Sequence, residues 1–402
     1  MIGFRQSLSC QDAMLRLKHD LLTPTGSKDT QAILGLDLRG AFNNIDHGSI
    51  LRGLNVINFG RKMHDYIREF LTNRTAVISL NDQTSPPITL GSFGTPQGSV
   101  LSPFLFNLAM RSIAGTLAEI PDLKYSLYAY DITLWIKGGS DGYIQDTLQQ
   151  AADVVATGAG FMNLECSPAK SELLLLSANK RDTPNIQIII NGKQVHVVDK
   201  IRVLGMHIQS NRLNTYTLQT VTASVDHTTR LIGRVSNKHG GLREAELLRL
   251  VQAFSVGKIT FSLPYLHLTR AEEDKVNSLI RRLYKFALGV PSTASTERLL
   301  ATGTLNTFSE LAEAHLTAQY QRLSNTYTGR QILTSLNITP APMTNEKFNI
   351  PHPIHEHFHI LPLPMNMHPV HHEHRRQQRA LQKKLSNFKD VVYVDAAEYP
   401  CG

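Results

Sequence analysis

The sequence predicts an α+β protein in which an antiparallel sheet with helices is followed by an all-helical region. Up to about residue 208, short apolar runs typical of buried strands alternate with segments of helical periodicity. After residue 210 the strand patterns stop and apolar residues recur at helical spacing. Residues 209–335 contain 15 Lys and Arg against 9 Asp and Glu, so most of the chain's net charge of +8 belongs to the helical region.

The composition is that of a globular protein with a basic surface. The 402 residues are 42% hydrophobic and 18% charged, which suits two or three domains. Cys10, Cys166 and Cys401 are odd in number and far apart, so we expect an intracellular location, in the nucleus or the cytoplasm. Neither a secretion signal nor a membrane-spanning apolar run is recognisable. A pI near 9.3 suits a polyanionic partner, although many unrelated proteins share such a value.

The expected elements of the first part of the chain alternate between helices and strands. In chain order they are a helix over 10–22, a strand over 32–38, helical segments over 45–71, a strand pair around a Pro-rich turn over 76–94, a helix over 98–119 and a hairpin over 126–135.

From residue 141 on, a helix and one further group of strands are expected, and after residue 210 only helices. They are a helix over 141–161, a strand over 171–177, a hairpin over 186–198 turning at Asn191–Gly192, one strand over 201–208, a helix from about 218 to 240, one around Leu247 and Val251, and one around Ile280 that Thr269 caps.

Residues 336–389 are predicted to be a Pro/His-rich linker and a basic stretch. Five prolines and eight histidines fall within 351–374. Imidazoles are good metal ligands, so a metal site is one interpretation. We prefer the linker, because proline interrupts regular elements and no cysteine lies nearby.

Three segments contain residues suited to chemistry. Asp37 ends an apolar strand, "GTPQG" brings two glycines close to Gln97 before a long helix, and "YAYD" puts Asp131 at a hairpin bend. Each pattern alone fits an ordinary turn or helix cap.

Together and in this order, "LDLRGAFNNIDH", "GTPQGSVLSPFLFN" and "LYAYDITLW" resemble the palm of reverse transcriptases, in particular those of LINE-type (non-LTR) retrotransposons. The family has an aspartate with an aromatic five residues on, a PQG-x-x-LSP-x-LFN helix start and a Tyr/Phe-Ala-Asp-Asp hairpin. The flanking segments "GFRQSLSCQDA", "CSPAKSELLLL" and "VLGMHI" are similar to the last fingers segment, the next motif with its lysine, and the primer grip. The resemblance covers roughly residues 1–330.

The resemblance implies a polymerase right-hand fold with partial fingers, read as an interior fragment of a retrotransposon polyprotein. Its parts would be a fingers remnant at 1–30, the palm at 31–208, a helical thumb at 209–335, the linker and basic stretch at 336–389, and a truncated RNase H-like start at 390–402. In that last part "VVYVDAAEY" carries Asp395 as the first acid.

The resemblance also implies an RNA-directed DNA polymerase that extends a DNA primer on an RNA template with dNTPs. Two Mg²⁺ ions, or Mn²⁺, would run the phosphoryl transfer, with Asp37 and Asp131 as catalytic metal ligands.

Five further residues are expected to bind substrate. Phe42 would lie under the incoming sugar and exclude a 2′-hydroxyl, while Gln97 and Gly98 would shape the nucleotide pocket. Arg5 and Lys170 would counter phosphate charge, and the basic helices would follow the template–primer backbone.

Position 130 departs from the family pattern, because Tyr130 stands where the first of two adjacent aspartates is expected. A neutral phenol is a poor Mg²⁺ ligand, so we expect the rate to fall by orders of magnitude. Tyrosine keeps the β-propensity of the hairpin, so folding need not suffer. Two alternatives stay open: a non-catalytic nucleic-acid-binding relic, and a sequence error or polymorphism at position 130.

Overall fold

The computed structural model describes residues 1–23, 29–176, 184–236, 241–301 and 305–342, which belong to one compact unit, Met1–Met343. The His-rich segment 351–374 and the predicted RNase H start with Asp395 lie outside the described residues. Among the helices of the described residues, none combines the length and the apolar character needed to cross a membrane.

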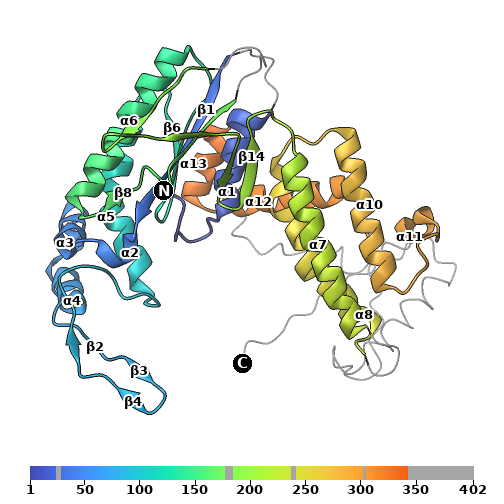
Figure 1. The fold of residues 1–402 in the computed structure, drawn as a ribbon, viewed down its shortest axis with the longest axis horizontal. Coiled ribbons are helices and arrows are strands. Elements are labelled where there is room, and N and C mark those ends of the chain that lie inside the picture. Colours follow the sequence, from blue (N-terminus) through green and yellow to red (C-terminus); the bar gives the residue numbers. More distant parts are fainter. Residues whose placement is uncertain (24–28, 177–183, 237–240, 302–304, 343–402) are drawn as a thin grey trace, which may run out of the picture. The chain divides into compact units, whose positions relative to one another are not determined.

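The centre of the fold is a sheet in the strand order β12-β9-β1-β7-β6 (Figure 1). Its strands are β12 (His196–Val198), β9 (Glu172–Leu176), β1 (Gln31–Arg39), β7 (Asp131–Ile136) and β6 (Lys124–Tyr128), and β8 (Glu165–Cys166) pairs with the end of β1. The predicted antiparallel arrangement holds for β1 with β7 and β9 and for β6 with β7. Only the β12–β9 pair among these strands is parallel.

The sheet is buried on both faces because β1 is apolar on both. Leu34, Leu36 and Leu38 belong to a core with α5 (Leu101–Ala118) and α6 (Asp141–Phe161). Ile33 points to the opposite face, into a second core that includes α1 and the helices after residue 215. Successive strand residues point to opposite faces, so a run without polar residues is what a doubly covered strand requires.

The first helices confirm the expected positions and add one interruption. Helix α1 (Cys10–Leu17) continues into a π-helical turn (Lys18–Leu22), which matches the predicted helix over 10–22. The short helix α2 (Ala41–Asn44) precedes the helical stretch expected over 45–71, which is divided into α3 (His47–Val56) and α4 (Arg61–Leu71). The break before α4 lies at Asn58 and Gly60, whose φ angles of 52° and 83° are left-handed and end a helix.

The two long helices over the sheet agree with the periodicity of the sequence. Helix α6 has the predicted bounds, and α5 begins three residues after the predicted start. The apolar stripe along α5 and the turn after it is buried: Phe106, Met110, Ile113, Leu117 and Ile120.

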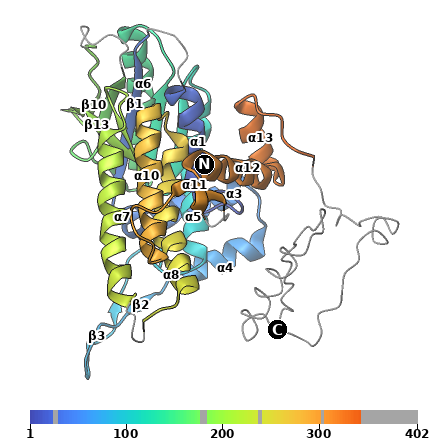
Figure 2. The same cartoon turned by 90° about the vertical axis from the view of Figure 1, so that its right-hand side faces the viewer.

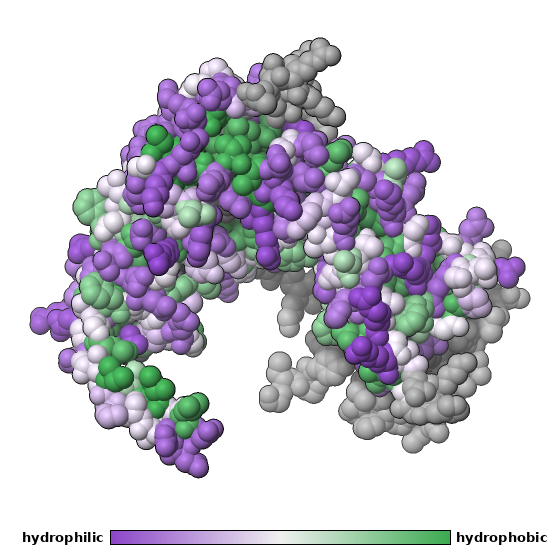
Figure 3. Space-filling view, viewed as in Figure 1, coloured by the Kyte–Doolittle hydropathy of each residue, from purple (hydrophilic) through white to green (hydrophobic). Residues whose placement is uncertain are grey.

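The strand pair predicted over 76–94 forms, but its turn is elsewhere. Strand β2 (Thr75–Ala76) pairs with β5 (Ile88–Thr89), and β3 (Ser79–Leu80) pairs with β4 (Gln83–Thr84). The chain reverses at Asn81, whose φ is 51°, and not at the two prolines. This arm, residues 75–89, exposes apolar side chains including Ile78 and Leu80. In Figure 3, hydrophobic atoms gather on the arm at the lower left.

The hairpin predicted to turn at Asn191–Gly192 is confirmed as β10 (Ile189–Ile190) and β11 (Lys193–Gln194). Its second arm ends early, because β12 leaves to pair with β9. The single strand predicted over 201–208 is wrong: this segment is a hairpin of β13 (Lys200–Val203) and β14 (Met206–Gln209). The reversal occurs because Leu204 and Gly205 adopt φ angles of 49° and 96°.

The remaining described elements are helical, as predicted. They form α7 (Thr215–Val235), α8 (Glu244–Val251), a π-helical turn (Gln252–Val256), α9 (Gly257–Ser262), a 3₁₀ turn (Leu263–Tyr265), α10 (Arg270–Ala287), α11 (Thr296–Ala301), α12 (Phe308–Ser324) and α13 (Tyr327–Ser335). Thr269 caps α10 as predicted, because its Oγ1 accepts a hydrogen bond from the Glu272 backbone N–H at 3.3 Å. Helices α7 and α10 run side by side in Figures 1 and 2. The predicted domain boundaries within this compact unit stay predictions.

Candidate active site

The two predicted catalytic aspartates lie opposite each other in the sheet. Asp37 on β1 and Asp131 on β7 are register partners of an antiparallel pair. Directly opposed residues project from the same face with their Cβ atoms about 5 Å apart. Further along this face, a Cβ added to Gly35 would lie 3.1 Å from Cδ1 of Ile201 on β13. The β13–β14 hairpin therefore covers the sheet close behind the two carboxylates.

Lys170 joins this pair through the turn that follows β8. The Ser167 backbone N–H donates to the Asp37 carbonyl at 2.9 Å, and the Lys170 N–H donates to the Ser167 carbonyl at 3.2 Å. The Lys170 Nζ lies 3.7 Å from Asp37 Oδ2, and the lysine side chain is 68% exposed. An exposed pair at this distance contributes little stability. Lys170 is thus a solvent-accessible cation beside the carboxylates.

The electrostatics of the pair favour a proton or a cation at Asp131. Partial burial, and in second place the negative charge of Asp37, raise the pKa of Asp131 above its ordinary value. The positive charge of Arg202 on β13 acts in the opposite direction. Two neighbouring carboxylates are more stable when a positive charge lies between them.

Tyr130 is at the tip of the hairpin that carries Asp131. Tyr128 and Asp131 form the last strand pair, so Ala129 and Tyr130 make a two-residue turn. Ala129 is left-handed with φ 55°, and the Tyr130 side chain is 43% exposed. The turn keeps its hairpin geometry with a phenol at position 130.

The donor set suits a divalent hard cation only in part. Mg²⁺ prefers carboxylate oxygens, and Asp37 and Asp131 supply two carboxylates on one face. Within the described residues no group of three or more His, Cys, Asp or Glu side chains is placed to hold a metal ion. Tyr130, which directly precedes Asp131 in the hairpin, offers only a neutral oxygen.

The predicted nucleotide-binding turn is tied to the segment that follows Asp37. The Thr95 N–H donates to the Phe42 carbonyl, and the Gly94 N–H donates to the Ile45 carbonyl, both at 2.8 Å. Gly94 has a φ of 77°, and a Cβ there would lie 2.6 Å from the Asn43 carbonyl oxygen. Only glycine permits this approach.

The predicted pocket residues Phe42 and Gln97 are linked through this junction by their neighbours Asn43 and Thr95. Gln97 Nε2 donates to the Asn43 side-chain oxygen at 2.8 Å. The Phe42 ring stacks on buried Phe106 with ring centroids 4.8 Å apart. Gly98 follows Gln97 with a φ of 92°, and a Cβ added there would have nothing within 4 Å. The turn and the Phe42 ring therefore form one connected unit.

Arg5 has contacts in a different direction. Its guanidinium donates to Thr328 Oγ1 on α13 at 2.9 Å and to the Met1 carbonyl at 3.5 Å. The structure thus brings together Asp37, Asp131 and Lys170, and separately joins the Phe42–Asn43 segment to the turn that carries Gln97. For Arg5 it records contacts with α13 and with the chain next to it.

Two residues that the sequence analysis did not single out also belong here. Arg202 is the charge on β13 that acts on Asp131. Phe4 makes ring contacts with both Phe42 and Tyr128. Its place beside Arg5 in "GFRQ" was the signal that could have marked it, whereas the effect of Arg202 depends on an unexpected hairpin.

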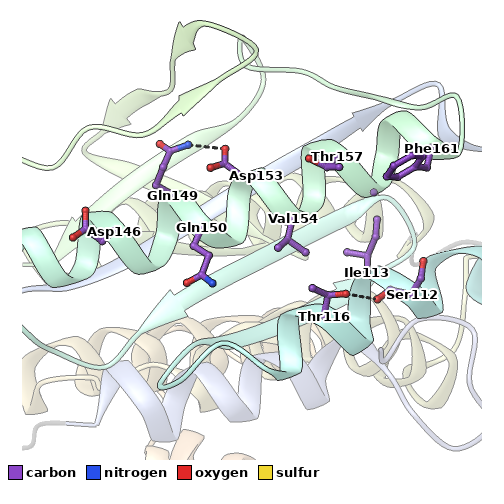
Figure 4. A pocket seen from close by; sticks show the side chains of 11 residues that line it. Ser112, Ile113, Thr116, Asp146, Gln149, Gln150, Asp153, Val154, Thr157 and Phe161 are labelled. Carbon is purple, nitrogen blue, oxygen red and sulfur yellow. Dashed lines mark hydrogen bonds between the residues drawn. The ribbon is translucent and has the colours of Figure 1, made fainter.

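A groove lies away from these residues, between α5 and α6. It has a volume of about 680 Å³ and is lined by Thr116, Asp146, Gln150 and Phe161 among others (Figure 4). None of the predicted site residues lines it. We therefore place the candidate active site at the paired carboxylates on the sheet.

An antiparallel sheet with paired carboxylates, a glycine turn leading into a long helix, and a following helical region together define an α+β polymerase fold. Residues 1–208 match the family described as "Reverse transcriptase (RNA-dependent DNA polymerase)", and the chain belongs to this family.

Relatives of the chain confirm its resemblance to proteins of non-LTR retrotransposons. A putative 115 kDa protein in the type-1 retrotransposable element R1DM of Drosophila melanogaster is 28% identical over 209 residues, which are 51% of this chain and 19% of that protein. A Pol polyprotein from element R2 of Popillia japonica is 28% identical over 106 residues, 26% of this chain and 17% of that protein. The chain thus spans less than a fifth of the length of these relatives.

A solved structure of apo telomerase from Candida tropicalis, truncated from its C-terminal domain, is also similar. It is 12% identical with a TM-score of 0.38, over 50% of this chain and 38% of that chain.

Proposed function

We propose that this chain is the RNA-directed DNA polymerase domain of a non-LTR retrotransposon protein, with nucleotidyl transfer impaired by Tyr130. The observation that carries the proposal is the register pairing of Asp37 with Asp131, next to a phenol at the hairpin tip. In the family pattern another aspartate, the first of two adjacent ones, occupies that tip. The chain keeps the face on which carboxylates converge and lacks one of its acids.

Asp37 and Asp131 would hold Mg²⁺ or Mn²⁺. A bound divalent ion supplies charge stabilisation to phosphoryl transfer worth several kcal/mol. Replacing one carboxylate by a phenol weakens that hold, and each 1.36 kcal/mol lost in the transition state lowers the rate about tenfold. We therefore infer a loss of at least about a hundredfold relative to a chain with aspartate at position 130.

The nucleotide would bind beside the carboxylates. Phe42 would contact the sugar of a dNTP. The stacked Phe106 ring supports the Phe42 ring from behind. Gln97, oriented by Asn43, and Gly98 would border the same pocket. Lys170, 68% exposed beside Asp37, is available to a triphosphate, and Arg5 would act on phosphate only by leaving Thr328.

RNA template and DNA primer would follow the basic helices. The described helices α7, α8 and α10 carry Arg230, Arg249 and Arg281 among their cations. Binding of this kind depends on phosphate charge and not on base sequence. Free thiols at Cys10 and Cys166 suit the intracellular location, nucleus or cytoplasm, that belongs to this proposal.

A second candidate is a nucleic-acid-binding protein without catalysis. The Lys170–Asp37 ion pair favours it, because a lysine already neutralises part of the charge that would attract a metal ion. Both candidates share the template–primer interaction and differ only in incorporation.

The experiment that separates them combines binding and incorporation on a poly(rA)/oligo(dT) template–primer. The chain and its Tyr130→Asp variant would be compared with Mg²⁺ and with EDTA. Retained binding with metal-dependent incorporation by the Tyr130→Asp variant supports the polymerase. Retained binding with no incorporation by either protein favours the second candidate, and loss of binding in both contradicts the two proposals together.

A further inference from the structure

The residues just before α1 connect the catalytic hairpin to the last described helices. We call residues 2–7 the strap. At one end, the backbone N–H groups of Ile2 and Gly3 donate to the Leu127 carbonyl on β6, at 2.9 and 3.3 Å. At the other end, Arg322 on α12 donates to the Ser7 carbonyl. The strap is therefore anchored on both sides of Phe4.

The strap fits closely against the hairpin turn. A Cβ added to Gly3 would lie 2.8 Å from the Ala129 backbone nitrogen. Asn107 Nδ2 on α5 donates to the Gly3 carbonyl at 2.8 Å. These contacts fix where the next residue, Phe4, can place its ring.

Phe4 has a backbone conformation that is unfavourable for an aromatic residue. Its φ is 55°, in the left-handed region that glycine adopts far more readily. Strained residues persist where the surrounding contacts hold them, and they cluster at functional sites. Phe4 is 49% exposed, so core packing alone does not explain the phenylalanine.

The Phe4 ring lies against two aromatic residues beside the candidate active site, Phe42 and Tyr128. It meets Phe42 edge-on, with ring centroids 6.1 Å apart and an interplanar angle of 83°. It lies 6.2 Å from Tyr128, the strand partner of Asp131. Because Phe42 also stacks on Phe106, the Phe42 ring is held between a buried ring and an exposed one.

We infer that Phe4 is a positioning residue that holds the Phe42 ring in place and thereby sets the preference of the pocket for dNTPs over rNTPs. This inference rests on the proposed function of Phe42 as the residue beneath the sugar. An edge-to-face contact restricts the tilt of a ring. Without it, Phe106 is the remaining ring contact of Phe42 within the described residues, and the ring can move away from an incoming 2′-hydroxyl.

The test uses the full chain carrying Tyr130→Asp as the parent protein and adds Phe4→Ala. Single-nucleotide incorporation of dTTP and UTP on poly(rA)/oligo(dT) gives kcat/KM for each nucleotide. We expect the dTTP-to-UTP ratio to fall about fivefold, which corresponds to the loss of one edge-to-face contact. Phe4→Tyr, which keeps the ring, should restore the ratio.

The chain offers a matched control in Phe59. This ring is 47% exposed and meets Phe104 edge-on, with centroids 5.9 Å apart and an angle of 84°. Phe59→Ala should leave the ratio unchanged. Phe4→Gly distinguishes the effect of backbone strain at position 4 from the effect of the lost ring contact with Phe42. Glycine adopts the left-handed backbone without strain, and it has no ring. It should lower the ratio as Phe4→Ala does, with no loss in Tm.

A second measurement needs no chemistry. The protein is bound to a template–primer whose primer ends in a dideoxynucleotide, so that no bond can form. The fraction of this complex that survives a heparin challenge is measured with dTTP and with UTP, and it reports which nucleotide stabilises the complex. A reduced preference for dTTP in Phe4→Ala and Phe4→Gly supports the inference. An unchanged preference in both, with the parent still favouring dTTP, overturns it and leaves the proposed function intact. If neither nucleotide is incorporated by the parent or stabilises its complex, the proposed function fails and the inference fails with it.

Discussion

Asp37 and Asp131 are strand partners on β1 and β7, and their convergence depends on the register of these two strands. A slip of one residue would turn one carboxylate to the opposite face. The register is fixed by burial, since Leu36 and Ile132 are paired neighbours in one core while Ile33 and Trp135 are paired in the other. The hydrophobic pattern of the strands therefore positions the polar site.

Asp131 should respond to pH through stability. Because burial and Asp37 raise the pKa of Asp131 in the folded chain, its ionised form opposes folding. This cost is fully present above the raised pKa and disappears as the pH falls below the ordinary carboxyl pKa. Asp131→Asn should raise Tm by about 1–2 °C at neutral pH and make no difference in acid. Asp82→Asn, at an exposed position, is the control, and a lower Tm for Asp131→Asn at neutral pH would contradict this account.

The ion pair between buried Asp12 and partly exposed Arg322 should be a main link between α1 and α12. Asp12 is fully buried and accepts from Arg322 at 2.6 and 3.2 Å. Arg322→Met should lower the free energy of unfolding by about 3 kcal/mol, because the remaining charge is buried. The expected loss is at the low end of the range for a broken buried pair, because Gln319 and the Ser9 N–H still donate hydrogen bonds to Asp12.

The control for this prediction is Arg282→Met, measured by the same urea denaturation. Arg282 pairs with Asp226 where both side chains are exposed, at 58% and 40%. Its loss should cost less than about 1 kcal/mol. Equal losses in the two variants would show that burial does not set the strength of the Asp12 pair.

Gly94 and Gly98 should differ in their tolerance of alanine although both have a positive φ. A Cβ at Gly94 would meet the Asn43 carbonyl oxygen at 2.6 Å, whereas at Gly98 nothing lies within 4 Å. Gly98→Ala should cost about 1 kcal/mol of stability, for the backbone conformation alone. Gly94→Ala should cost about 3 kcal/mol, because a backbone clash is added to that conformation. Urea denaturation of both variants measures the difference, and equal costs would contradict the close approach.

Binding of template–primer should depend steeply on salt. The chain carries a net charge of +8, and phosphate contacts release counterions when they form. The affinity for poly(rA)/oligo(dT) should fall about tenfold or more between about 50 and about 200 mM salt, with little dependence on base sequence. Fluorescence anisotropy measures both dependences. Affinity insensitive to salt would rule out a phosphate-based interface.

The parts of the fold that could be predicted from sequence are those set by local pattern. Strand β1, helix α6 and the turn at Asn191–Gly192 follow from apolar runs, periodicity and turn residues. The β13–β14 hairpin was missed because Leu204, a residue that rarely takes a left-handed φ, forms half of its turn. The parallel pairing of β12 with β9 depends on tertiary packing, and no local pattern indicates it.

The candidate site divides in the same way. Asp37 and Asp131 were expected together because the family order of motifs implies it, and their register agrees with that expectation. The Gln97–Asn43 bond and the Arg5–Thr328 bond join residues 54 and 323 positions apart. Such contacts depend on how distant elements pack, so sequence spacing could not indicate either partner.

The most direct test of the central claim is primer extension on poly(rA)/oligo(dT) with Mg²⁺ or Mn²⁺, comparing the chain with Tyr130→Asp and Tyr130→Phe. Tyr130→Phe controls for replacing the residue without supplying a carboxylate. We predict that Tyr130→Asp extends the primer at least about a hundredfold faster than the other two proteins. Equal extension by all three proteins would contradict the account, because Asp37 and Asp131 would then suffice without a carboxylate at position 130.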